Sequence, residues 1–170
     1  MLILNELPTR NLGHINCSSI GRKPETRVLG REVVLVKYVV WDSAWSVGVA
    51  EIDRQHRKIM DMINRLESAR INGMSAMMVE GILEELAKYT QYHFGLEEMY
   101  FDEFKYEDAE KHKAAHRALT LQVESFRKAY SEKREELTEN IIKFLQDWLN
   151  IHIKGSDLQY RECFLSNGLK

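Results

Sequence analysis

Residues 79–101 read VEGILEELAKYTQYHFGLEEMYF, and this stretch decides the fold. Its apolar residues recur at steps of three and four, as on one face of an α-helix. That face comprises Val79, Ile82, Leu83, Leu86 and Tyr89. His93 and Glu97 extend the same face by one turn each. Because an apolar helix face must be covered by other helices, the pattern predicts a bundle with polar donors inside it.

Three further segments show the same periodicity. One runs from about residue 53 to Asn72-Gly73, a pair that commonly terminates helices. Another spans about residues 108–130, and the last begins near Leu137-Thr138, with Thr138 as its N-cap, and reaches His152. Together with a helix over about residues 75–101, they predict an all-α fold, an up-down-up-down four-helix bundle.

Residues 1–36 differ from the rest, because they hold both prolines and lack helical periodicity. We expect an N-terminal extension that is flexible or loosely packed, followed by the bundle domain over residues 37–170. The β-branched cluster at residues 33–40 leaves a short strand open as an alternative. Residues 42–48 are expected to form an ordered loop, with Trp41 and Trp45 closing the end of the bundle.

Composition excludes several functions. A formal charge of −2 leaves no basic excess for neutralising nucleic-acid phosphates. No apolar run approaches the ~20 residues of a membrane span, and the N-terminus does not resemble a secretory signal. Cys17 and Cys163 are too few and too far apart for a disulfide framework, so we expect reduced thiols in a cytoplasmic protein. No nucleophile–base arrangement or phosphate loop is present, and we predict no catalytic residues.

Histidines and carboxylates recur on the apolar faces of all four predicted helices. The set comprises His56, His93, Glu97, His112, His116, His152 and Asp157. Seven donors exceed the four that one tetrahedral zinc ion takes, and they fit two transition-metal ions bridged by two carboxylates. Imidazole with carboxylate suits iron, zinc, copper, nickel or manganese better than calcium or magnesium. His14 lies far upstream with no partner nearby, and we expect it to be a hydrogen-bonded core or boundary residue.

Asp157 follows His152 by five residues, which would turn it ~140° away on an ideal α-helix. The helix must therefore end or widen between them, and Gly155-Ser156 is a suitable place.

The alternative to a metal site, core filling by five buried histidines, would carry a large uncompensated desolvation cost. Six methionines could line a ligand tunnel, but filling gaps in the core is the favoured interpretation. They are Met60, Met62, Met74, Met77, Met78 and Met99.

At these residues the chain resembles the hemerythrins, specifically the single-domain bacteriohemerythrins. The resemblance covers about 120 of 170 residues, from Trp41 to about Tyr160. The matching segments are Ile52-Asp53-x-Gln55-His56, His93-Phe94-x-x-Glu97-Glu98, His112-x-x-x-His116 and Trp148-Leu149-x-x-His152-Ile153 with Asp157.

The resemblance implies a non-haem di-iron centre that binds dioxygen reversibly. His112, His116 and His152 would hold one iron, and His56 and His93 the other. Glu97 and Asp157 would bridge the two irons, and dioxygen would bind at the iron with two histidines. Leu149, one turn before His152, would point into the oxygen pocket.

The expected function is oxygen storage or delivery to oxygen-requiring enzymes by a monomer that is not itself an enzyme. The first alternative is a di-iron oxidoreductase acting on peroxide or nitric oxide on the same scaffold. The second is an oxygen- or redox-sensing module, for which residues 1–36 would be the place to respond. Histidine-rich ligation and a dry pocket walled by Leu, Ile, Phe and Trp favour holding oxygen over cleaving it.

Overall fold

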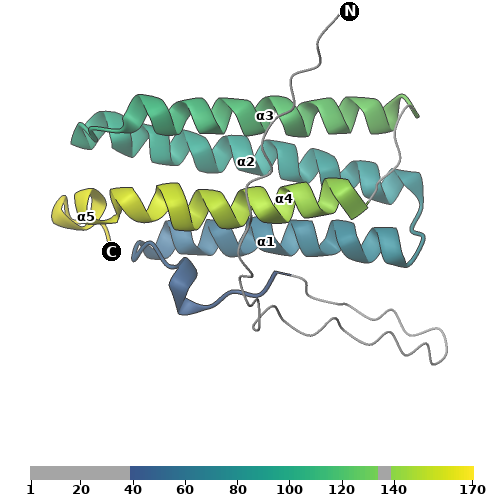
Figure 1. The fold of residues 1–170 in the computed structure, drawn as a ribbon, viewed down its shortest axis with the longest axis horizontal. Helices are drawn as coiled ribbons and strands as arrows, with labels where there is room; N and C mark the ends of the chain where they lie inside the picture. Colours follow the sequence, from purple (N-terminus) through teal and green to yellow (C-terminus); the bar gives the residue numbers. More distant parts are fainter. Residues whose placement is uncertain (1–38, 134–138) are drawn as a thin grey trace, which may run out of the picture. The chain divides into compact units, whose positions relative to one another are not determined.

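The computed structural model describes residues 39–133 and 139–170. Four helices form an up-down-up-down bundle: α1 (Ala50–Ile71), α2 (Ala76–Phe104), α3 (Ala109–Ser131) and α4 (Glu139–His152). A π-helical turn, η2 (Ile153–Asp157), leads from α4 into the short helix α5 (Leu158–Ser166) (Figure 1). The predicted all-α four-helix bundle is confirmed. The extension over residues 1–36, His14, Cys17 and the Thr138 N-cap lie outside the described residues.

Helix α1 begins three residues earlier than its apolar pattern indicated. Asp53 therefore lies within the first turn, where its side chain binds the preceding loop. Its carboxylate accepts hydrogen bonds from the Val47 amide at 2.8 Å and from the Ser46 hydroxyl. These bonds hold the preceding loop against the first turn of the helix, where the Ala50 amide donates to the Lys170 carbonyl at 3.0 Å. The other end was predicted correctly, since Asn72 is the C-cap and Gly73 takes a φ of +59°.

The bundle packs pairwise, with α2 against α1 and α3, and α1 against α4. Buried side chains form two clusters. The main core is mostly aliphatic, draws on all four helices and includes Ile59, Ile63, Leu66, Leu119, Leu145, Leu149 and Ile153. The end core lies where α2 meets α5 and consists of Val47, Val49, Ile52, Phe101, Tyr160 and Phe164.

The described part of the loop before α1 begins at Val39. Its backbone exchanges two hydrogen bonds with the Asn64 side chain, at 2.9 and 2.8 Å. Trp45 lies in the 3₁₀ turn η1 (Ser43–Trp45) and is buried in the main core, as closing the bundle requires. The ammonium of Lys154, on the π turn, lies 4.4 Å from the centre of the Trp45 ring. Val39 and Val40, the described part of the alternative strand, are not in a strand.

The prediction for the methionines is correct for only half of them. Met60 and Met62 are buried, and Met74 packs against the main core. In contrast, Met77, Met78 and Met99 are exposed, with Met77 at 78%. Their helical spacing resembled a core stripe because α2 carries apolar residues outside its buried face.

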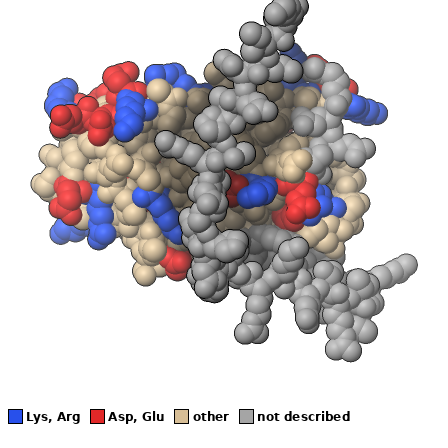
Figure 2. Space-filling model, in the orientation of Figure 1, with Lys and Arg blue, Asp and Glu red and all other residues tan. Residues whose placement is uncertain are grey.

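Within the described ranges, no helix has the length and apolar run that a membrane span requires. On the face shown in Figure 2, basic and acidic side chains are interspersed, without one sign dominating the described surface. The described cysteine, Cys163, is a free thiol.

Candidate metal centre

The structure brings all seven predicted donors together inside the bundle. His56 comes from α1, His93 and Glu97 from α2, His112 and His116 from α3, His152 from α4, and Asp157 from the π turn. All seven are buried, and Glu97, Asp157 and His56 are 0% exposed. The i, i+4 spacing on α2 and α3 stacks each pair on one helix face, so that both members point inward.

Glu97 lies between two groups of imidazoles. Its Oε1 is 3.6 Å from Nε2 of His93 and 3.8 Å from Nε2 of His56. Its Oε2 faces the other way, 3.2 Å from Nε2 of His116. One carboxylate thus presents one oxygen to each group.

Asp157, on the π turn after α4, is placed in the same way between the two groups. Its Oδ2 is 3.2 Å from Nε2 of His56, while its Oδ1 is 3.1 Å from Nε2 of His112 and 3.2 Å from Nε2 of His152. The two carboxylates therefore divide the five imidazoles in the same way, two on one side and three on the other.

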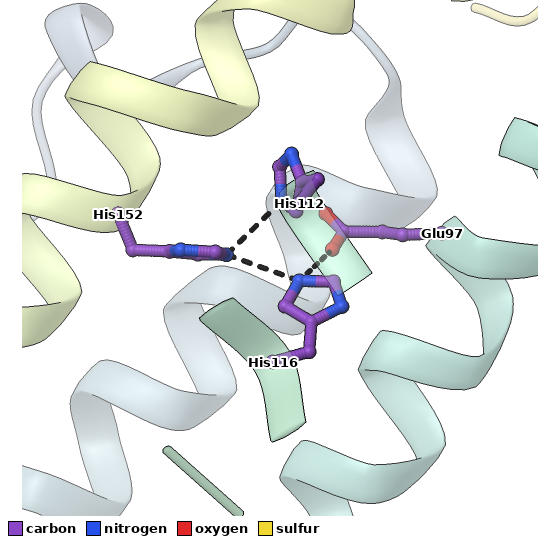
Figure 3. A group of neighbouring side chains, drawn as sticks. All are labelled: Glu97, His112, His116 and His152. Atoms are coloured by element: carbon purple, nitrogen blue, oxygen red, sulfur yellow. Dashed lines mark hydrogen bonds and ion pairs between the residues drawn. The ribbon is translucent and has the colours of Figure 1, made fainter. Parts of the chain in front are cut away.

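The three imidazoles on the second side converge on one point (Figure 3). Nε2 of His152 lies 3.2 Å from Nε2 of His112 and 3.1 Å from Nε2 of His116. Two groups of donor atoms can each surround an ion: Glu97 with His112, His116 and His152, and Glu97 with His56 and His93. Glu97 belongs to both groups, so two ions there would share it.

The π turn explains how Asp157 reaches the site despite its five-residue spacing from His152. The predicted widening is confirmed, since residues 153–157 form a π turn and α5 continues from Leu158. A π turn takes up an extra residue and brings the i+5 position back toward the face of residue i.

Several donor atoms are buried without a hydrogen-bond partner among the described residues. They are Nδ1 and Nε2 of His56, Oε2 of Glu97 and both carboxylate oxygens of Asp157. The carboxylate oxygens lie near imidazole nitrogens but in directions that make no hydrogen bond. Burying such atoms unpaired is costly, whereas coordination to a cation would satisfy them. The donor set therefore fits two transition-metal ions.

The electrostatics of the imidazoles and carboxylates suit metal binding. Burial lowers the pKa values of His93 and His152 to about 4, so both imidazoles are neutral at neutral pH. Burial alone would raise the pKa of Glu97, but the surrounding imidazoles, His93 first, lower it to about 2. The pKa of Asp157 is lowered in the same way, mainly by His152. Neutral imidazoles and ionised carboxylates are the forms that coordinate metals.

His116 differs from these two histidines. Burial lowers its pKa, but the carboxylates of Glu97 and Glu98 outweigh burial, and the net pKa is raised. For Tyr160, burial and the charge of Glu97 act in the same direction, and both raise the pKa of its phenol. The phenol therefore stays protonated and can donate.

Three side chains outside the predicted donor set contact it. Gln55 Oε1 lies 2.9 Å from Nδ1 of His93, and Glu98 Oε1 lies 3.0 Å from Nδ1 of His116. The hydroxyl of Tyr160 donates to Oε1 of Glu97 at 2.5 Å. Tyr89 and Tyr92, close to His93 in sequence, pack against each other at 5.9 Å between ring centres. Their positions in the sequence are the signals that could have identified them. Gln55 and Glu98 are each next to a predicted donor, and Tyr160 follows Asp157 by one helical turn.

A small cavity of about 10 Å³ adjoins the donor set, with His56 and His93 of the two-histidine side and His152 of the other side in its wall. Its walls include His56, His93 and Asp157, together with Leu149 and other apolar residues of the main core. This volume is about what one water-sized molecule needs, so only a very small ligand can occupy it. The expectation that Leu149 faces a pocket beside the donors agrees with its place in this wall.

A helical bundle in which two buried carboxylates each face two groups of imidazoles defines the class of carboxylate-bridged dinuclear metal proteins. Residues 47–162 match the hemerythrin HHE cation binding domain. The chain therefore belongs to the hemerythrin family, which binds oxygen at a di-iron site.

Individual relatives agree with this assignment. The chain is 31% identical to a bacteriohemerythrin of Stenotrophomonas maltophilia over 124 residues, covering 73% of this chain and 80% of the relative. It is 30% identical to a hemerythrin-like protein of Naegleria gruberi over 121 residues, covering 71% and 89%. A crystal structure of wild-type hemerythrin superposes with a TM-score of 0.71 at 29% identity, covering 74% of this chain and 97% of that one.

Proposed function

We propose that this chain binds dioxygen reversibly at a di-iron centre and serves to store oxygen or deliver it to oxygen-requiring enzymes. His112, His116 and His152 would hold one iron, His56 and His93 the other, and Glu97 and Asp157 would bridge them. The observation that carries the proposal is the division of each carboxylate. Each one turns one oxygen to the three-histidine side and one to the two-histidine side.

When bound, the iron pair supplies the electrons that hold dioxygen. The chain supplies the surroundings, which favour release over cleavage. Outside the candidate ligands, the described cavity wall offers no carboxyl or imidazole that could deliver a proton. Its one hydroxyl, on Thr90, already donates to the backbone carbonyls of Leu86 and Ala87, at 3.0 and 3.1 Å. A peroxidase would need an acid or base at this position.

The cavity also sets the size of the ligand. At about 10 Å³ it suits a diatomic molecule and excludes bulky organic substrates. A cavity of this size beside the donor set suits one small ligand per centre, as a protein that takes up and releases oxygen requires.

The test is metal analysis with absorption spectra recorded before and after oxygen is admitted. We expect two irons per chain and a charge-transfer band that appears with oxygen and disappears when oxygen is removed. His93→Ala should abolish the band while helix content by circular dichroism is retained. Normal oxygen binding by this variant would refute the ligand assignment, and sustained oxidation of an added substrate would favour an oxidoreductase.

A further inference from the structure

In two of the candidate ligands, the outer imidazole nitrogen, Nδ1, which is not the one facing the carboxylates, makes a hydrogen bond. The partner of this bond differs between the two histidines. Nδ1 of His116 meets the carboxylate of Glu98 at 3.0 Å, and Nδ1 of His93 meets the amide oxygen of Gln55 at 2.9 Å. Both partners accept, so each imidazole carries its proton on Nδ1. That tautomer leaves Nε2, the atom facing Glu97, free to bind a metal.

The difference between these partners is charge. A carboxylate on the outer nitrogen makes an imidazole a more basic ligand, and losing such a partner typically weakens metal binding about 10- to 100-fold. The amide of Gln55 is neutral. Its own nitrogen donates at 2.6 Å to Glu51, so the nearest charge on that side is one residue further from the imidazole.

The remaining histidine on the two-histidine side adds to this inequality. Nδ1 of His56 is buried with no hydrogen-bond partner among the described residues. One side of the centre thus has three imidazoles and a charged outer partner. The other has two imidazoles, one with a neutral partner and one with none.

We propose that Glu98 and Gln55 are positioning residues that make the two metal positions unequal. The position of His112, His116 and His152 then fills first and empties last, and the position of His56 and His93 exchanges its ion. This inference rests on the di-iron assignment proposed above. It goes beyond that assignment because it fixes the order of loading and names residues outside the ligand set as its cause.

The position of Glu98 makes the proposal testable without disturbing the core. Its side chain is 33% exposed and borders a surface groove between α2 and α3, where Gly95 leaves open space. Glu98→Gln keeps the size and the hydrogen bond to His116 but removes the charge. Glu103→Gln removes one charge from an exposed position on the same helix and is the matched control.

The experiment loads the whole chain with ferrous iron without oxygen, then adds a ferrous-specific chelator and follows ions per chain by native mass spectrometry. The original chain and E103Q should pass through a persistent one-ion species. In E98Q the later ion should leave about tenfold faster, so that this species shrinks. Circular dichroism of the loaded proteins confirms folding.

A reciprocal variant completes the design. Gln55→Glu places a charge beside His93 and should slow release of the first ion. Because Gln55 is fully buried, a charge there can prevent folding, and the E98Q–E103Q pair then decides alone. Loss of both ions together from the original chain, or an unchanged one-ion species in E98Q, overturns the proposal. Failure to bind two ions at all would instead refute the proposed di-iron function.

Discussion

The main core and the end core adjoin the candidate centre, and they are built from different side chains. Beside His56 and His93, branched aliphatic residues of the main core pack around a cavity of about 10 Å³. In the end core, the rings of Tyr160 and Phe164 stack with 4.2 Å between their centres, and the Phe101 ring contacts the candidate ligand His112, tilted at 4.9 Å.

The difference between these cores indicates a division of labour. Aliphatic side chains of unlike shape leave a small gap where the ligand is expected. Flat rings fill their space and hold the hydroxyl of Tyr160 against Glu97. One core would therefore control access to the centre, and the other would hold its bridging carboxylate in place.

The largest expected effect comes from removing the metal, because the centre borders both cores. Each ion bound at a metal concentration a thousandfold above its Kd adds about 4 kcal/mol to the unfolding free energy, so two ions add about 8 kcal/mol. Stripping with a chelator should remove this gain and leave the seven buried donors uncompensated. Urea unfolding with and without chelator measures the difference. Equal midpoints would show that the donors do not bind metal.

A smaller effect is expected from Leu149→Ala, which enlarges the cavity in the main core. The loss should be about 2–5 kcal/mol of unfolding free energy, as for buried leucines generally. Oxygen should also leave faster, because the wall beside the ligand is removed. Leu66→Ala is the matched control, since Leu66 is equally buried in the main core but outside the cavity wall. Stopped-flow oxygen release should separate the variants, and equal rates would contradict this role of the cavity.

In the end core, Tyr160→Phe removes one oxygen and keeps the ring. Hydrogen bonds to charged groups contribute about 1.5–3 kcal/mol, and we expect a loss in that range. The absorption of the loaded centre should shift, because Glu97 loses its donor. Tyr106→Phe is the control, since Tyr106 packs against Phe101 at the edge of the end core and is only partly buried. Similar spectra for both variants would mean that the end core contributes only packing.

The smallest effect is expected far from both cores. Lys143 and Asp147 form an exposed i, i+4 ion pair on α4, with Nζ and Oδ2 2.6 Å apart. Lys143→Ala should cost less than about 0.5 kcal/mol and leave oxygen release unchanged. Thermal unfolding at low and high salt measures this. A loss above about 1 kcal/mol would indicate that surface charges, and not only the two cores, stabilise the bundle.

The fold could be predicted from sequence because helical periodicity depends on local spacing alone. Val79, Leu83 and Leu86 repeat at intervals that no strand would bury on one side. Helix ends were less accurate, since Asp53 influences the start of α1 through contacts with the preceding loop. Helix α5 was not anticipated, because its residues 158–166 carry no clear apolar stripe of their own.

The donor set could also be predicted, since His93 with Glu97 and His112 with His116 are pairs that any helix brings together. What sequence could not provide was how the carboxylates divide their oxygens, or which side chains contact the outer nitrogens. Glu98 and Gln55 reach His116 and His93 across helix–helix interfaces. Such contacts depend on how the helices are rotated against each other.

The π turn at residues 153–157 also determines which insertions and deletions this chain can tolerate. The turn already accommodates one residue more than an α-helical repeat. Deleting one residue there would leave an ordinary helix with the carboxylate of Asp157 only ~40° from the direction of His152. Inserting one would rotate the carboxylate of Asp157 by ~100° from its present direction, away from the imidazoles that it now faces. We therefore expect the centre to tolerate a deletion of one residue between His152 and Asp157, but not an insertion of one.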